Sequence, residues 1–244
     1  SEMCIRDSVK SAADNFSHQV CQAFEKKRKN RKKLAIDKIM LDGFKSLESR
    51  DFKIENGEKI MEHARSIKSA EEIKAMRCSI SACETSIHVM EKETKPGMTE
   101  NDIWSILHSE NIKRGGEWIE TRLLSSGTKT NPWFQECGSR ILQKNEIVAF
   151  DTDLVGCYSM CTDISRTWWI GDQEPTKEMK QDYQIALEHI QKNAELVAPG
   201  VHFKDLTFKG HQLDDVYKKQ QYSCRFHGVG LCDEFPLITY PEDY

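Results

Sequence analysis

A long helix followed by Pro-Gly and a second short helical segment is predicted twice in this 244-residue chain, and this repetition limits the folds it can adopt. In the first copy, apolar residues are spaced three and four positions apart from Ile73 to Met90, which places them on one helix face. Pro96-Gly97 ends that helix. In the second copy the same spacing runs from Met179 to Val197 and ends at Pro199-Gly200. A repeat of this length predicts a duplicated half-domain and not a solenoid.

Residues that cap helices stand where the helices are expected to begin. Ser69, with Glu72 three residues later, has the form of a capping box, and Thr99 and Thr176 occupy equivalent places before the next two helices. Between the helices, strands are predicted at 118–124, 147–153 and 163–170, where apolar runs are separated by Gly, Asn and Pro. This order of elements predicts an α+β domain with helices covering one face of a curved antiparallel sheet.

Composition excludes several classes of protein. The net charge of -4 gives no reason to expect nucleic acid or a membrane surface as a partner, and no apolar run has the length of a membrane span. The nine cysteines are odd in number and form no C-x-x-C pair, which indicates reduced thiols in a cytoplasmic protein.

The basic run from Lys26 to Lys33 is interpreted as a solvated helix face or connector, with a phosphate-binding or nuclear-localisation patch as the alternative.

Three carboxylates follow or begin predicted strands and form the first candidate site. Asp151 and Asp153 end one strand, and Asp163 begins the next strand after a short turn at Gly156. Paired strands would bring the three together, and converged carboxylates repel one another unless a cation or proton lies between them. A metal ion would satisfy that requirement. The alternative is one aspartate in a turn and one in a salt bridge with Arg166.

A histidine near the end of the chain is the second candidate. His227 precedes Gly228-Val229-Gly230, and glycine leaves room for a close approach of the backbone to a ligand. The alternative is a hydrogen-bonded histidine with no ligand. The glycine segment is too short to predict a nucleotide-binding loop.

Taken in order, these segments resemble the pita-bread metallopeptidase family, which includes methionine aminopeptidase, creatinase and Xaa-Pro dipeptidase. The resemblance rests on Asp151, on the D-I-S-R-T segment at 163–167 and on H-G-V-G at 227–230. It implies a fold with pseudo-two-fold duplication, a partial N-terminal domain with a basic connector at 1–66, and a catalytic domain at 67–244. It also implies that the chain is a C-terminally truncated fragment, because the family's last two metal-binding glutamates follow the H-G-x-G segment.

Three departures from the family peptidases bear on activity. The spacing from Asp151 to Asp163 differs from theirs, and Trp133 follows the S-G-T-K-T-N-P stretch where they have a substrate-side histidine. The loop after H-G-V-G is one residue shorter, and Asp233-Glu234 replaces their His-Glu. Peptide cleavage would need another proton donor for the leaving amine.

These departures form a pattern of their own. The segments 115–122, 131–137 and 227–235 closely resemble the dimethylsulfoniopropionate lyase branch of this fold. The resemblance implies cleavage of a small-molecule substrate, dimethylsulfoniopropionate, to dimethyl sulfide and acrylate. It implies a cytoplasmic homodimer at full length. It also implies a metal, iron before manganese, zinc or cobalt. The implied residues are the metal ligands Asp151, Asp153, Asp163 and His227, the base Asp233, and the substrate contact Tyr222.

Trp133 is a candidate for a second substrate contact, because an aromatic ring face attracts a sulfonium cation; core filling is the alternative.

Two other functions remain open. One is a metal-dependent hydrolase of a small peptide or amide. The other is a non-catalytic binding protein that keeps the fold.

Overall fold

The computed structural model describes residues 6–27 and 32–244, so the middle of the basic run, residues 28–31, lies outside the described residues. The chain divides into two compact units, Ser1–Ile67 and Lys68–Tyr244. Within the described residues, no helix has the length and apolar character needed to span a membrane.

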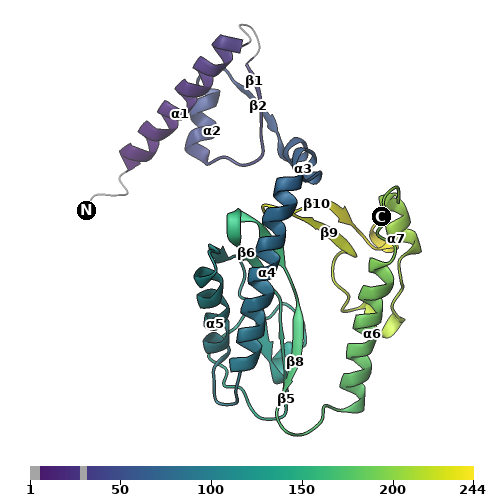
Figure 1. Cartoon of the computed structure of the whole chain (residues 1–244). Helices are drawn as coiled ribbons and strands as arrows, with labels where there is room; N and C mark the ends of the chain where they lie inside the picture. The colour runs from purple at the N-terminus through teal and green to yellow at the C-terminus, as the bar shows by residue number, and fades with distance from the viewer. Residues whose placement is uncertain (1–5, 28–31) are drawn as a thin grey trace. The chain divides into compact units, whose positions relative to one another are not determined.

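The first unit is a small α/β arrangement (Figure 1). Its elements are α1 (Arg6–Lys27), β1 (Lys33–Ile36), α2 (Leu41–Glu48), β2 (Lys53–Asn56) and α3 (Glu58–Ser66). Strands β1 and β2 pair in parallel. Helix α1 packs on α2, where the Ser17 and Ser46 hydroxyls lie 2.8 Å apart in a buried hydrogen bond.

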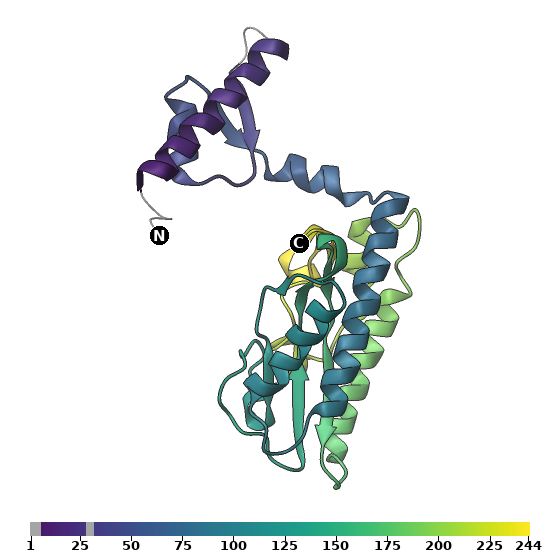
Figure 2. The same ribbon diagram turned by 60° about the vertical axis from the view of Figure 1, so that its left-hand side comes forward.

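The second unit opens with two packed helices, α4 (Ala70–Glu93) and α5 (Glu100–Lys113), which lie beside its strands (Figure 1 and Figure 2). Both begin with a capping box, formed by Ser69 with Glu72 and by Thr99 with Asp102. Each box satisfies backbone N–H groups that have no partner within the helix. The two predicted helix starts are therefore confirmed.

Each of the three predicted strands is divided between two sheets. The strands are β3 (Trp118–Ile119), β4 (Leu124–Ser126), β5 (Glu146–Phe150), β6 (Asp153–Val155), β7 (Cys161–Asp163) and β8 (Arg166–Ile170). They form two antiparallel sheets of three, in the orders β3-β6-β7 and β4-β5-β8. The chain passes from one sheet to the other at Asp151–Thr152 and at Ile164–Ser165, so two of the candidate carboxylates flank these crossings. Short 3₁₀ helices, η1 (Gly127–Thr130) and η2 (Cys157–Ser159), lie in the connections.

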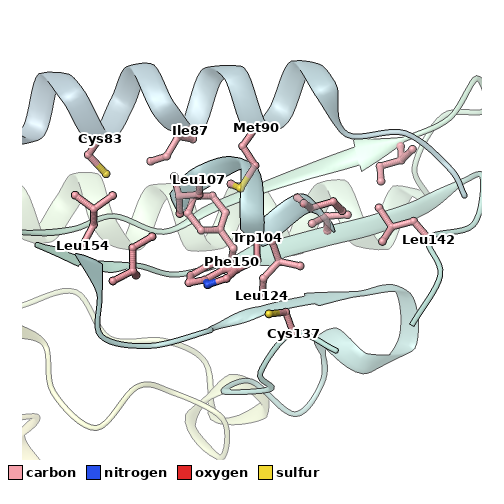
Figure 3. Close-up of a cluster of buried hydrophobic side chains, with 14 residues drawn as sticks. Cys83, Ile87, Met90, Trp104, Leu107, Leu124, Cys137, Leu142, Phe150 and Leu154 are labelled. Atoms are coloured by element: carbon pink, nitrogen blue, oxygen red, sulfur yellow. The ribbon is translucent and has the colours of Figure 1, made fainter. Parts of the chain in front are cut away.

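The core lies between helix α4, helix α5 and the strands (Figure 3). Met90 from α4, Leu107 from α5 and Phe150 from β5 are fully buried. The Phe150 ring meets Trp168 of β8 edge to face, with ring centroids 5.6 Å apart. Because burial of each such side chain contributes roughly 1.5–3 kcal/mol, this cluster fixes the strands that carry the carboxylates.

The second copy of the repeat consists of α6 (Lys177–Ala194), α7 (Phe203–Lys209), α8 (Asp215–Lys218), β9 (Phe226–Val229), β10 (Asp233–Ile238) and the 3₁₀ helix η3 (Pro241–Asp243). Strands β9 and β10 pair antiparallel. Thr176 caps α6 as predicted, its side chain accepting from the Met179 N–H. The apolar face of α6 is not buried, however: Tyr183 and Ile190 are more than half exposed. Strand β10 packs against α7.

Candidate metal centre and substrate site

The hairpin of β6 and β7 brings two of the candidate carboxylates together. Asp153 lies directly opposite Asp163 in the antiparallel register. Residues paired in this way have Cβ atoms about 4.5–5.5 Å apart on one face of the sheet. The convergence expected from the Gly156 turn is therefore a consequence of the register.

Strands β9 and β10 supply the next two side chains. His227 Nε2 lies 3.0 Å from Asp163 Oδ2, and His227 Nδ1 lies 3.9 Å from Asp233 Oδ1. The backbone joins the two hairpins, since the Cys161 N–H donates to the Gly230 carbonyl at 2.8 Å. Ligand atoms of Asp163, His227 and Asp233 all lie within 4.8 Å of one another. Residues far apart in sequence thus meet at one point.

Asp151 lies at the crossing between the two sheets. Its Oδ1 accepts a hydrogen bond from the Ser165 hydroxyl at 2.7 Å and one from the Thr152 N–H at 3.1 Å. Ser165 lies at the other crossing, so this hydrogen bond joins the two. Burial, and then the neighbouring charge of Asp163, raises the pKa of Asp151 to about 7.

The cluster carries more negative charge than it can neutralise by itself. Burial, followed by the charges of Asp153 and Asp163, raises the pKa of Asp233 to about 6. The hydrogen bond to Asp163 raises the pKa of His227 to about 9, so the imidazolium is the positive charge among four carboxylates. A divalent or trivalent cation would take over that role, and one imidazole with several carboxylate oxygens is a donor set that suits iron, manganese, zinc or cobalt. The residues therefore fit a metal site.

Three aromatic rings, those of Trp133, Phe134 and Tyr222, contact one another in a row. The Tyr222 and Phe134 ring centroids are 5.5 Å apart, and the Phe134 and Trp133 centroids are 6.1 Å apart. Burial, then the charges of Cys224 and Asp163, raises the pKa of Tyr222 to about 12, so Tyr222 lies within electrostatic reach of the cluster. The ring in contact with Tyr222 is that of Phe134, which the sequence did not single out. Its signals in the sequence were its place next to Trp133 and within the segment 131–137 that resembles the lyase branch.

Glu234 has a different environment from its neighbour Asp233. The Glu234 carboxylate is buried and forms an ion pair with Lys68 Nζ. A side chain on Gly230 would collide with this carboxylate, and one on Gly228 would collide with the Phe235 carbonyl. The glycines of the H-G-V-G segment are therefore required by close packing of β9 on β10.

The fold and this cluster define a class of protein. The sequence profile of metallopeptidase family M24 matches residues 74–243, and the chain belongs to this family. Solved structures share the fold. The X-Pro aminopeptidase of Thermotoga maritima superposes with a TM-score of 0.74 at 22% identity, covering 94% of this chain and 65% of that one. A dipeptidase of Pyrococcus horikoshii has a TM-score of 0.76 at 21% identity, covering 92% and 64%. The predicted fold is confirmed.

Two curated relatives are much more similar to the chain in sequence than these solved structures are. Both are called dimethylsulfoniopropionate lyase DddP, from Roseobacter denitrificans and Roseovarius nubinhibens, and both are 52% identical to it over 241 residues. The match covers 97% of this chain and 54% of each relative, so the chain spans about half their length. The predicted resemblance to the lyase branch is confirmed.

Proposed function

We propose that this chain belongs to a dimethylsulfoniopropionate lyase, which splits its substrate into dimethyl sulfide and acrylate by β-elimination. The observation that carries the proposal is Asp233, a carboxylate with a raised pKa whose oxygen lies within 4.8 Å of ligand atoms of Asp163 and His227. The 52% identity to two proteins called dimethylsulfoniopropionate lyase supports it.

The cluster would hold the metal through Asp151, Asp153, Asp163 and His227, and we propose iron as that metal. When bound, it would supply Lewis-acid chemistry that polarises the substrate carboxylate and acidifies the neighbouring C–H bond. Family M24 metallopeptidases are metal-dependent, which supports the presence of a metal at this site.

Asp233 would act as the general base. A carboxylate with its ordinary pKa is a weak base at neutral pH, and a pKa near 6 brings Asp233 closer to the operating pH. Its oxygen takes the proton from the carbon next to the substrate carboxylate. The electron pair of that C–H bond forms the C=C bond of acrylate, and the C–S bond breaks with its electrons going to sulfur. Dimethyl sulfide leaves as a neutral molecule and needs no proton.

Tyr222 and Trp133 would bind the substrate. Tyr222 lies within electrostatic reach of the carboxylates, and its half-exposed ring is accessible to a ligand. Neither ring has to move a proton in this reaction, because the leaving group is neutral. A cytoplasmic homodimer at full length, with residues 1–66 as a separate domain, completes the proposal.

The proposal is tested by headspace detection of dimethyl sulfide from the natural protein at its full length, loaded with iron and given dimethylsulfoniopropionate. Asp233→Asn should abolish the gas and leave the bound metal unchanged. Asp172→Asn, at an exposed aspartate outside the cluster, is the matched control and should keep both. A folded, metal-loaded protein that forms no dimethyl sulfide would overturn the lyase assignment. Loss of metal in Asp233→Asn would overturn the assignment of the base.

A further inference from the structure

Phe134 has an unusual backbone conformation for a bulky residue. Its φ is 67°, in the left-handed region that residues other than Gly, Asn and Asp rarely adopt. The ring is 50% exposed and does not fill the core. Such a conformation persists only where surrounding contacts impose it, and it is concentrated at ligand sites.

A buried carboxylate anchors both ends of the segment that carries Phe134. Glu100 on α5 is fully buried, and its Oε1 accepts from the Ser126 N–H at 2.9 Å and the Ser126 hydroxyl at 2.8 Å. Its Oε2 accepts from Lys129 Nζ at 2.7 Å and from the Gly138 N–H at 3.1 Å. Ser126 and Gly138 stand on either side of the segment 127–137, so Glu100 fixes both of its ends.

The same segment is connected to Asp151, which lies between β5 and β6. Glu136 pairs with Leu123 in an isolated bridge, and the Leu123 carbonyl accepts from the Asp151 N–H at 2.8 Å. The backbone of this segment is thus linked through Leu123 to Asp151, and the Phe134 ring itself contacts Tyr222, with ring centroids 5.5 Å apart.

We propose that Phe134 is a specificity-determining residue whose ring binds the cationic group of the substrate together with Tyr222, and that Glu100 is its positioning residue. The inference rests on the proposed function in so far as the cation is a sulfonium. A dialkylated sulfonium has no N–H or O–H to donate, so hydrogen bonding cannot recognise it. An aromatic face beside a negatively charged cluster recognises such a cation through its charge.

The test compares two ligands of nearly the same shape. Dimethylsulfoniopropionate carries a positive sulfur, and 4-methylpentanoate has an uncharged carbon at the same place. Their dissociation constants are measured by calorimetry on the metal-loaded, full-length protein carrying Asp233→Asn, so that the substrate is not consumed. The ratio of the two constants isolates the contribution of charge from that of shape.

Phe134→Leu should lower this preference for the cation about 2- to 30-fold, the range expected for one cation–π contact. Phe134→Tyr, which keeps a ring, should retain it. The matched control is Phe208→Leu on α7, because Phe208 is 48% exposed and also contacts a tyrosine ring, Tyr244, at 5.0 Å. Glu100→Gln should also lower the preference for the cation. Its effect on the affinity for 4-methylpentanoate should be smaller than its effect on the affinity for dimethylsulfoniopropionate.

An unchanged ratio in a folded Phe134→Leu protein would overturn the inference, even where the unmodified protein forms dimethyl sulfide. Should Phe134→Leu fail to fold, the same ratio measured on Phe134→Met decides. The proposed function is tested separately. If the unmodified protein releases no dimethyl sulfide but prefers the cation, and Phe134→Leu loses that preference, the proposed function fails and the inference about Phe134 stands.

Discussion

Asp163 connects more of the candidate site than any other single residue. Its carboxylate contacts His227, its backbone pairs with Asp153, and its charge raises the pKa values of Asp151 and Asp233. Removal of this carboxylate would therefore change both the proposed ligand set and the charge balance of the cluster.

Asp163→Asn should weaken metal binding by at least about 100-fold, because losing even an outer hydrogen-bonding partner of a metal ligand typically lowers affinity 10- to 100-fold. The measurement is a metal titration monitored by isothermal calorimetry. Asp172→Asn should bind metal as the unmodified chain does. Unchanged affinity in Asp163→Asn would exclude Asp163 as a ligand.

His189 gives the fold a dependence on pH that is separate from the metal site. Burial, then the charges of His211 and Arg225, lowers the pKa of His189 to about 4. Its Nδ1 lies 3.1 Å from His211 Nδ1, and its ring stacks on Tyr240 with centroids 6.5 Å apart. The unfolded chain takes up this proton near the ordinary histidine pKa of about 6.5, well before the folded chain does.

The free energy of unfolding should therefore fall as the pH is lowered from about 6.5 towards 4, because in that range the unfolded state binds the additional proton. Urea unfolding at pH 7.5, 6.5, 5.5 and 4.5 measures this dependence. His189→Gln should make it shallower. An equally steep dependence in His189→Gln would assign the effect to other groups.

At the scale of elements, local signals predicted the starts of three helices but not the limits of the strands. Ser69, Thr99 and Thr176 could be predicted as caps because a cap depends on residues within one turn. The division of the predicted strand 147–153 at Asp151 was missed, because it depends on strands that lie far away in sequence. The position of Phe134 beside Tyr222 was missed for the same reason. Glu100 holds both ends of the segment that carries Phe134 through residues distant in sequence, and no local pattern encodes these contacts.

Two capping substitutions test how much the helix starts contribute. Ser69→Ala and Thr99→Ala should each lower the free energy of unfolding by about 1 kcal/mol, since each leaves an N-terminal backbone N–H without its side-chain acceptor. Thr85→Ala, at an exposed position inside α4, is the control. It should be neutral or slightly stabilising, because alanine has the higher helix propensity. Equal effects at all three positions, measured by urea unfolding, would contradict the capping explanation.

At the scale of the whole molecule, the candidate centre lies where the two copies of the repeat meet. The first copy contributes Asp151, Asp153 and Asp163, and the second contributes His227 and Asp233. The contact between β7 and β9, with the Cys161–Gly230 backbone hydrogen bond, joins them. Neither copy alone supplies the three aspartates Asp151, Asp153 and Asp163 together with His227. The duplication visible in the sequence thus explains why a site forms at this place.

All five of these residues, and the buried Lys68–Glu234 ion pair, lie in the second compact unit. The hydrophobic cluster that supports the strands also lies within it. A protein consisting of residues 68–244 should therefore bind metal with the same stoichiometry as the 244-residue chain and unfold cooperatively. Metal titration and urea unfolding of the two proteins, side by side, provide the comparison. Asp163→Asn in the shorter protein should abolish the binding. Loss of metal binding on removal of residues 1–67 alone would mean that the first unit contributes to the site.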